Sequence, residues 1–152
     1  MYAKDVMSKD VGSIAATAAV FDAATLLVDS RLSAVPVVDA DGTMVGIVSE
    51  ADIIKGAAAA AKRVGLDVLG RIDDGERAAA AVDAARSLRV SDVMSRGVIA
   101  AHETATLREV ARLMLTHRIK CIPIVRDRSL LGIVNRADLL KALISYGPSA
   151  YA

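Results

Sequence analysis

The sequence predicts an α+β fold made of two copies of one βαββα unit, joined by an Ala-rich helical connector. Three observations predict it. Four motif blocks recur in the same order, 86 or 87 positions apart. Each copy shows helix-like and strand-like hydrophobic patterns in the same succession. The segment between the copies has no counterpart, and it is rich in Ala, which has a high helix propensity.

The recurring blocks are spread along most of each copy. They are DVMS at 5–8 and again at 92–95, VPVV at 35–38 matched by IPIV at 122–125, and GIVS at 46–49 with Asp52 matched by GIVN at 132–135 with Asp138. Because blocks in one order and almost one register are not expected by chance, the two copies should share one fold.

The first helix of each copy is predicted from an apolar stripe at helical spacing. Its members are Val20, Ala23, Ala24, Leu27 and Val28 in the first copy, and Leu107, Val110, Ala111, Met114 and Leu115 in the second. Thr106 and Glu109 have the spacing of a capping box at the start of the second of these helices.

A β-hairpin follows in each copy. The run 34–38, the turn signal Asp41-Gly42 and the run 44–48 predict the first hairpin, and the second turn is expected at 127–129. Because Pro has no N–H to donate to a ladder, Pro36 and Pro123 are expected at a strand start or on a sheet edge.

Helices are expected after both hairpins and within the connector. The closing helices should cover 51–61 and 137–145, the latter ending before Gly147-Pro148. In the connector, Ala-rich residues 78–85 favour a further helix, and a loop is expected near Asp73-Asp74-Gly75.

The composition excludes several functional classes. The 152 residues include 19 Lys and Arg against 18 Asp and Glu, so no general attraction for nucleic acid or anionic membranes is expected. A single Cys, Cys121, excludes an internal disulfide and a cysteine-based zinc cluster within one chain. Without a membrane-spanning apolar run or a signal-peptide core, the chain is expected to be cytoplasmic.

The sequence holds no recognisable catalytic or metal-binding constellation. Walker motifs, zinc signatures and a Ser/His/Asp order are missing, so an enzyme is not expected. Cys121 stands in an apolar strand and is expected to be a buried, inert thiol. His102 and His117 make no metal-ligand spacing and are expected to be solvated.

The strongest candidate site lies where the last strand of each copy ends and a helix begins. Ser49 with Asp52, and Asn135 with Asp138, occupy these positions. Helix capping alone explains them, since Ser and Asn are favoured N-caps and an acidic residue three positions later complements the free amides. A carboxylate there can also accept two hydrogen bonds from a vicinal diol such as a ribose. The residues alone leave both interpretations open.

Both copies resemble cystathionine-β-synthase (CBS) domains, and the pair resembles a Bateman module. The matching segments are 5–8, 33–39 and 46–49 with Asp52 in the first copy, and 92–95, 117–125 and 132–135 with Asp138 in the second. The resemblance divides the chain into a first CBS domain (1–56), the connector (57–90), a second CBS domain (91–147) and a C-terminal tail (148–152). It implies units packed through their sheets in a pseudo-twofold arrangement, commonly within a homodimer.

The resemblance also implies two clefts for adenosine compounds such as AMP, ADP, ATP or S-adenosylmethionine, bound as regulatory ligands and not as a required cofactor. The Asp of each cleft would bind the ribose. The implied contacts of the first cleft are Ser13, Ser33, Ala34, Val35, Pro36, Ser49 and Asp52, with Lys120 of the opposite copy, and more weakly Arg118, reaching phosphates. Those of the second cleft are Ala100, Cys121, Ile122, Pro123, Asn135 and Asp138.

These matches make the two clefts unequal. The Asp52 cleft has three Ser hydroxyls and the Lys120 cation, whereas the Asp138 cleft has Ala100 and Asn135 and no cation from the opposite copy. A phosphorylated ligand is therefore expected to prefer the Asp52 cleft by roughly tenfold to hundredfold. Two functions stay open: a nucleotide sensor that regulates an unidentified effector protein, and a structural dimerisation or partner-binding module with empty clefts.

Overall fold

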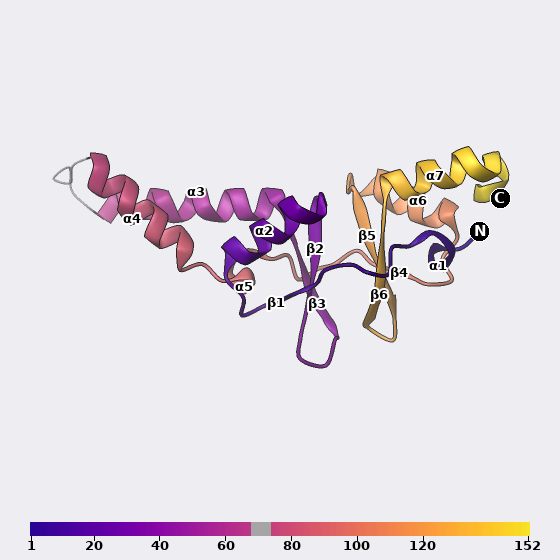
Figure 1. Cartoon of the computed structure of the whole chain (residues 1–152), viewed down its shortest axis with the longest axis horizontal. Coiled ribbons are helices and arrows are strands. Elements are labelled where there is room, and N and C mark those ends of the chain that lie inside the picture. The colour runs from indigo at the N-terminus through magenta and orange to yellow at the C-terminus, as the bar shows by residue number, and fades with distance from the viewer. Residues whose placement is uncertain (68–73) are drawn as a thin grey trace. The chain divides into compact units, whose positions relative to one another are not determined.

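The computed structural model describes residues 1–67 and 74–152, and both repeats contain the predicted succession of elements (Figure 1). The first repeat comprises α1 (Ala3–Val6), β1 (Ile14–Ala15), α2 (Val20–Ser30), β2 (Ala34–Val38), β3 (Met44–Ser49) and α3 (Glu50–Asp67). The second comprises α5 (Val90–Val93), β4 (Ala101–His102), α6 (Leu107–Thr116), β5 (Cys121–Arg126), β6 (Ser129–Asn135) and α7 (Arg136–Tyr146), with a 3₁₀-helix, η1 (Gly147–Tyr151), after it. Between the repeats lies α4 (Asp74–Arg86). The predicted α+β fold with an internal repeat is confirmed.

Each repeat forms its own three-stranded sheet, in the orders β1-β2-β3 and β4-β5-β6. In the second sheet the short β4 is parallel to β5, with Ala101 opposite Ile124. β5 and β6 form the predicted antiparallel hairpin. Its turn falls at Asp127 and Arg128, which both have positive φ, as the favoured type of two-residue hairpin loop requires.

Pro36 and Pro123 occupy the third positions of β2 and β5, which are the middle strands of their sheets. The expectation of a strand start or an edge is therefore wrong for both. In the second sheet the register shows why Pro is tolerated. Because β4 pairs only with Ile124 and Val125, it places no residue opposite Pro123. A neighbouring strand this short leaves the middle strand unpaired on one side at Pro123, so the missing N–H costs no ladder bond with β4.

The chain forms two compact units, and each unit contains segments of both repeats. The first unit comprises residues 1–12, 38–44 and 97–152, and the second comprises 13–37 and 45–96. Consequently α1, which begins the first repeat, packs with the body of the second repeat. In the same way α5, which begins the second repeat, packs with the body of the first. The two repeats have exchanged their N-terminal segments.

Equivalent backbone contacts hold the two exchanged segments. In the first unit, Ser8 and Ile133 form an antiparallel bridge with N···O distances of 2.9 and 3.0 Å. In the second unit, Ser95 and Ile47 form the corresponding bridge with distances of 2.8 and 2.9 Å. Each exchanged segment therefore extends the edge of a sheet that belongs to the other repeat.

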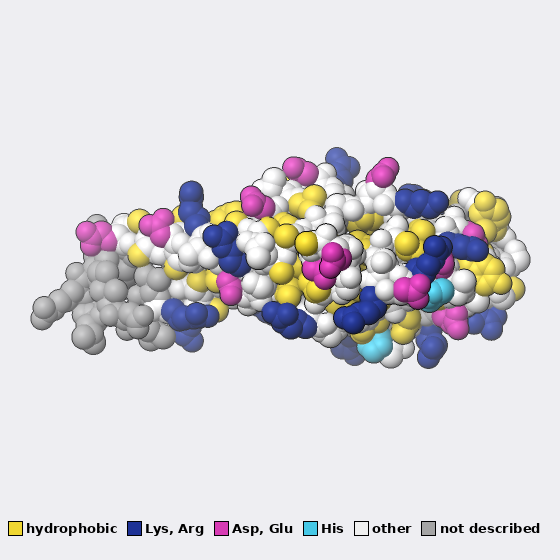
Figure 2. All heavy atoms as spheres, turned by 90° about the horizontal axis from the view of Figure 1, so that it is seen from below, with side chains coloured by type: hydrophobic (Ala, Val, Ile, Leu, Met, Phe, Trp, Pro, Cys, Tyr) yellow, Lys and Arg dark blue, Asp and Glu magenta, His cyan; other side chains and the backbone are white. Residues whose placement is uncertain are grey.

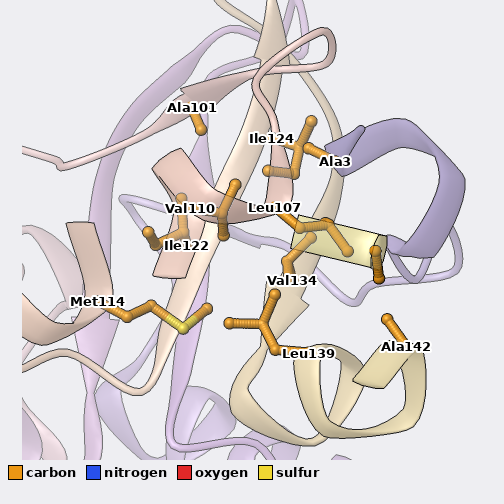
Figure 3. Packing of buried hydrophobic residues seen from close by; sticks show 11 residues of the cluster. Ala3, Ala101, Leu107, Val110, Met114, Ile122, Ile124, Val134, Leu139 and Ala142 are labelled. Atoms are coloured by element: carbon orange, nitrogen blue, oxygen red, sulfur yellow. The ribbon is translucent and has the colours of Figure 1, made fainter. Parts of the chain in front are cut away.

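Each unit has its own hydrophobic core, and each core includes one residue of the exchanged helix. In the first unit, Ala3 of α1 lies in one cluster with Leu107 and Val110 of α6 (Figure 3). In the second unit, Val90 of α5 is fully buried in one cluster with Val35 of β2. Because Ala3 and Val90 stand 87 positions apart, the two cores use equivalent residues for the same purpose.

The helix that closes the first repeat is longer than predicted. It continues past the expected end near residue 61 to Asp67, since no Pro interrupts the Ala-rich run. α4 then packs along α3 (Figure 1). The predicted helical connector is confirmed over the described residues. The loop expected near residues 73–75 is wrong at Asp74 and Gly75, which belong to α4. Residue 73 lies outside the described residues.

A reciprocal pair of capping hydrogen bonds fixes the start of α6. Thr106 N–H donates to Glu109 Oε2 at 2.7 Å and Glu109 N–H donates to Thr106 Oγ1 at 3.2 Å, which confirms the predicted capping box. Hydrogen bonds from the backbone and the hydroxyl of Thr106 lower the pKa of Glu109 below its ordinary value.

The backbone after the first helix of each repeat has the same unusual conformation. Arg31, directly after α2, and its equivalent Arg118, shortly after α6, both have a left-handed φ of 54°. That conformation is usually left to Gly.

Candidate functional site

In the second unit, a strand runs directly into a helix at the predicted site. β3 ends at Ser49 and α3 begins at the next residue. Ser49 N–H donates to Asp52 Oδ2 at 2.9 Å, and Asp52 N–H donates to Ser49 Oγ at 3.1 Å. Glu50 N–H donates to the carbonyl oxygen of Ser33 at 3.1 Å, which ties the residue before β2 to the start of α3. The structure therefore brings Ser33, Ser49 and Asp52 together.

The first unit repeats this arrangement at the start of α7. Asn135 N–H donates to Asp138 Oδ2 at 2.9 Å, and Asp138 N–H donates to Asn135 Oδ1 at 3.0 Å. Arg136 N–H donates to the carbonyl oxygen of Lys120 at 3.1 Å. Cys121 lies directly opposite Asn135 in the β5–β6 ladder. Asn135, Asp138 and the first residue of β5 are therefore neighbours.

The predicted capping is present in both repeats, and in the first repeat it engages only one of the two carboxylate oxygens of Asp52. Asp52 Oδ2 is engaged by the Ser49 amide, whereas Asp52 Oδ1 has no hydrogen bond or ion pair with any residue that the structure describes. The first turn of a helix also presents unpaired N–H groups and a partial positive charge. A carboxylate fixed at such a place can accept hydrogen bonds from the hydroxyls of a ligand while the amides face its other polar groups.

The two carboxylates differ in their surroundings. Lys141 Nζ lies 3.8 Å from Asp138 Oδ1, the oxygen that the Asn135 amide leaves free. The equivalent residue in the first repeat is Lys55, and within residues 1–67 and 74–152 no ion pair joins it to Asp52. Asp138 is 7% exposed, whereas Asp52 is only partly buried. The protein's own groups therefore occupy Asp138 more fully, and Asp52 is more available to a ligand.

Most of the other residues predicted for the Asp52 site lie in the same unit. Ser13 is exposed and directly precedes β1. Ala34, Val35 and Pro36 are buried in β2, and their assignment as ligand contacts stays a prediction. Lys120 belongs to the other unit, and its role toward Asp52 stays a prediction.

All residues predicted for the Asp138 site lie in the first unit. Ala100 directly precedes β4, and Ile122 and Pro123 are buried in β5. The side chain of Cys121 is buried, as predicted. The assignment of these residues as ligand contacts stays a prediction.

The remaining candidates for chemistry stand apart from these sites. His102 and His117 are exposed, as predicted. In the part of the chain that the structure describes, no three His, Cys, Asp or Glu side chains are grouped as a metal ion would require. No helix formed by the described residues combines the length and the apolar character needed to cross a membrane. Figure 2 shows basic and acidic side chains interspersed over one face, as expected from the balanced composition.

Two contributors to the site were not predicted from the sequence. One is the carbonyl oxygen that precedes β2 or β5 and accepts from the first amide of the closing helix. The other is Lys141, which competes for Asp138. A backbone carbonyl leaves no trace in residue type, and Lys141 has an equivalent Lys55 in the first repeat. Aligning the two repeats shows that a Lys follows each Asp at the same spacing. It does not show that only one of the two Lys residues approaches its Asp.

Comparisons with known proteins cover nearly the whole chain. The family model of the CBS domain matches residues 3–59 and 90–145. The chain is 34% identical to the uncharacterized protein MJ1426 of Methanocaldococcus jannaschii, over 95% of this chain and 92% of that protein. It is 30% identical to the uncharacterized protein YlbB of Bacillus subtilis, over 90% of this chain and 78% of that protein.

Solved structures show the same arrangement of elements. The CBS domain pair of protein MJ0100, in complex with 5′-methylthioadenosine and S-adenosyl-L-methionine, matches with a TM-score of 0.71 and 25% identity, over 95% of this chain and 97% of that one. The structure of CBSX2 in complex with AMP matches with a TM-score of 0.72 and 23% identity, over 95% and 96% of the two chains. The latter likeness concerns the fold.

Proposed function

Because the chain belongs to the CBS domain family, with one domain in each repeat, we propose that it is a regulatory sensor that binds an adenosine-containing nucleotide at Asp52. The observation that carries the proposal is the fixed carboxylate at the start of α3. Its Oδ2 atom accepts from Ser49 N–H at 2.9 Å, and its Oδ1 atom is not engaged by any described residue. This is the oxygen that we propose for the ribose.

The chemistry of a ribose suits this carboxylate. Two neighbouring hydroxyls can both donate to one carboxylate group, and such charge-assisted hydrogen bonds are stronger than neutral ones. The MJ0100 domain pair holds two compounds that each contain an adenosine moiety, which supports an adenosine ligand as the class. In this proposal Ser13, Ser33 and the backbone of residues 34–36 face the base, and Ser49 assists Asp52.

The proposal favours a phosphorylated ligand, such as AMP, ADP or ATP, at the Asp52 site over S-adenosylmethionine. Lys120 is the cation proposed to reach its phosphates. The Asp138 site is proposed as the weaker one, since Lys141 already lies 3.8 Å from the Asp138 carboxylate. Binding would regulate by shifting the population between two states of the protein, and the free energy available is the ligand's differential affinity for them.

Replacing Asp52 with Ala should weaken AMP binding by about tenfold to hundredfold, because the charge-assisted bonds to the ribose are lost. Asp138→Ala is the matched variant, since it removes the equivalent capping carboxylate, and we expect a much smaller loss from it. Isothermal titration calorimetry on both variants measures the difference. Asp52→Asn keeps an uncharged acceptor at the same place, and it should bind with intermediate affinity if the charge matters.

Variants that lose binding through a damaged helix start must be separated from those that lose a contact. Circular dichroism melting of each variant serves this purpose, because both Asp residues cap a helix. The proposal is wrong if AMP and ATP binding disappears in Asp138→Ala and persists in Asp52→Ala.

We also propose that the chain forms a homodimer through its helix pairs. Val28 of α2 and Ile54 of α3 are 76% and 68% exposed, and their equivalents Leu115 and Leu140, on α6 and α7, are 73% and 59% exposed. Both units therefore present large apolar side chains at matching positions. In the second unit these residues border a cavity of about 280 Å³ between α2 and α3. Exposed apolar surface that recurs in this way is typical of an interface.

The double variant Ile54→Lys/Leu140→Lys should shift the protein toward monomer, because two charges would have to be buried in each copy's interface. Native mass spectrometry of the purified protein reports the oligomer and any retained nucleotide in one measurement. Lys55→Ala is the control, since it changes an exposed neighbour of Ile54 without adding charge to an apolar face. An unchanged oligomer in the double variant contradicts the proposed interface.

The alternative function, a dimerisation or partner-binding module with no nucleotide, gains support from the same exposed helix faces. A thermal-shift screen with AMP, ADP, ATP, S-adenosylmethionine and NADH separates the two functions. A ligand that binds only the folded state raises the melting temperature, so the sensor should respond to at least one adenosine compound. No shift at millimolar concentrations favours the module without a ligand.

A further inference from the structure

A polar cavity lies in the first unit, apart from the Asp138 site of that unit. It has a volume of about 360 Å³, and its polar lining consists of Lys4, Asp5, Lys9, Glu103 and Arg126. The first three come from the exchanged N-terminal segment, and the other two come from the body of the second repeat. The cavity therefore exists only because the segment docks there.

The two carboxylates of the cavity are already engaged by the protein. Asp5 Oδ2 accepts from the backbone N–H of Tyr2 at 2.8 Å, at the start of α1. Glu103 receives two hydrogen bonds from Arg126, with Nε–Oε1 and Nη2–Oε2 distances of 2.5 and 2.6 Å. These bonds from Arg126 lower the pKa of Glu103 below its ordinary value, so Glu103 is ionised near neutral pH and balances the guanidinium.

The two Lys residues of the cavity keep their donors available. Among the ion pairs of the described residues, none includes Lys4 or Lys9. Lys4 Nζ lies 5.8 Å from the centre of the Tyr2 ring, which still leaves its three N–H groups open to an acceptor. Three cations face two engaged carboxylates, so the cavity has a surplus of positive charge and of unused donors.

The fold itself does not require this cluster. The positions equivalent to Lys4, Lys9, Glu103 and Arg126 in the other repeat hold Ser91, Arg96, Ala16 and Asp39. Of these, Asp39 Oδ1 accepts from the backbone N–H groups of Asp41 and Thr43 in the hairpin turn. One cation remains where the cavity has three. The charged lining is therefore a specialisation of the first unit and not a product of the repeat.

We propose that this cavity is a second ligand site, which binds a phosphate group through Lys4 and Lys9. The group could be inorganic phosphate or the phosphoryl group of a small metabolite, because both present the same charged oxygens. The site is distinct from the Asp138 site. Cys121 beside Asn135 and Arg126 beside the cavity are the two ends of β5, which a strand rise of about 3.3 Å per residue places about 17 Å apart.

The test is a titration with inorganic phosphate at neutral pH and constant ionic strength, followed by the amide NMR shifts of Lys9 and Glu103. Wild-type protein should show saturable shifts, and Lys9→Gln should weaken binding about tenfold, with Lys4→Gln as a second variant. Arg96→Gln is the matched control, because Arg96 is the exposed equivalent of Lys9 in the other repeat, and it should bind as wild type does. Lys4 and Lys9 are exposed, so both variants should fold normally.

Further arms identify the source of the phosphate and separate this proposal from the nucleotide site. Saturation by methyl phosphate as well as by inorganic phosphate supports a phosphorylated metabolite, whereas saturation by inorganic phosphate alone supports the free ion. Asp52→Ala should keep phosphate binding intact. The proposal fails if phosphate shifts these amides no more than chloride does, if Arg96→Gln weakens binding as much as Lys9→Gln, or if Asp52→Ala abolishes it.

Discussion

Replacing Leu107 with Ala should lower the free energy of unfolding by about 2–5 kcal/mol. Leu107 is the first residue of α6 and its side chain is fully buried. It lies in the core of the first unit together with Ala3 of the exchanged helix α1, and its N–H donates to the carbonyl oxygen of Met1 at 3.1 Å. Truncation removes apolar contacts and leaves a cavity between α6 and the exchanged helix α1. Because both helices are held in place by other contacts, the core has little freedom to close this cavity.

Urea denaturation followed by circular dichroism measures this loss. Thr116→Ala is the control, because Thr116 is on the same helix, is exposed, and is not among the apolar residues of the proposed dimer interface. Its substitution should change the free energy of unfolding by no more than about 0.5 kcal/mol. Equal losses in both variants would show that the core of the first unit is not organised around Leu107.

Replacing Gly132 with Ala should destabilise the protein by about 1–3 kcal/mol and loosen the exchanged N-terminal segment. A Cβ atom on Gly132 would lie 2.5 Å from the carbonyl oxygen of Ser8 and 3.0 Å from Met7 Sδ. Such an approach to a backbone oxygen cannot be relieved by a side-chain rotation, so the segment has to move. Ile133, the next residue, exchanges two hydrogen bonds with Ser8 at 2.9 and 3.0 Å, and these are the first to be lost.

Amide hydrogen exchange of Ile133 reports this movement directly, since its N–H donates to Ser8 in the native chain. Exchange should become faster in Gly132→Ala. Gly97→Ala is the control, because a Cβ at Gly97 meets nothing within 4 Å, and removing a Gly where space allows tends to stabilise. Full protection of Ile133 in Gly132→Ala would mean that the segment is held by something other than this bridge.

The elements of the fold could be predicted because their signals are local. The apolar stripe that includes Leu27, the turn at Asp41-Gly42 and the capping box at Thr106 each depend on neighbours in sequence. Pro36 and Pro123 could not be placed, because whether a strand has a paired neighbour depends on the length of another strand. Tertiary pairing decides that, and the residue type does not.

The exchange of segments could not be predicted for a different physical reason. The DVMS motifs at 5–8 and 92–95 are identical, and both sheets offer a Gly where the segment crosses, at Gly46 and Gly132. The motif itself therefore does not indicate on which of the two sheets it docks.

The residue types of the candidate sites could be predicted, but the degree to which the protein's own groups engage each Asp could not. Ser49 with Asp52 and Asn135 with Asp138 form the expected reciprocal hydrogen bonds. Ala100, Asn135 and Lys120 predict a difference between the two sites. The structure adds Lys141 beside Asp138, a contact that depends on side-chain placement and not on which residues are present.

The exchanged segments determine what a single repeat can do by itself. A chain cut between α4 and α5 yields two pieces. The N-terminal piece carries α1, which packs in the core of the C-terminal piece, and the C-terminal piece carries α5, which packs in the core of the N-terminal piece. Alone, each piece would have an open core and an uncovered sheet edge. It could close both only by trading helices with a second piece, as domain-swapped proteins do. In this respect the two halves of the chain depend on each other as the subunits of an obligate dimer do, and the connector joins them covalently.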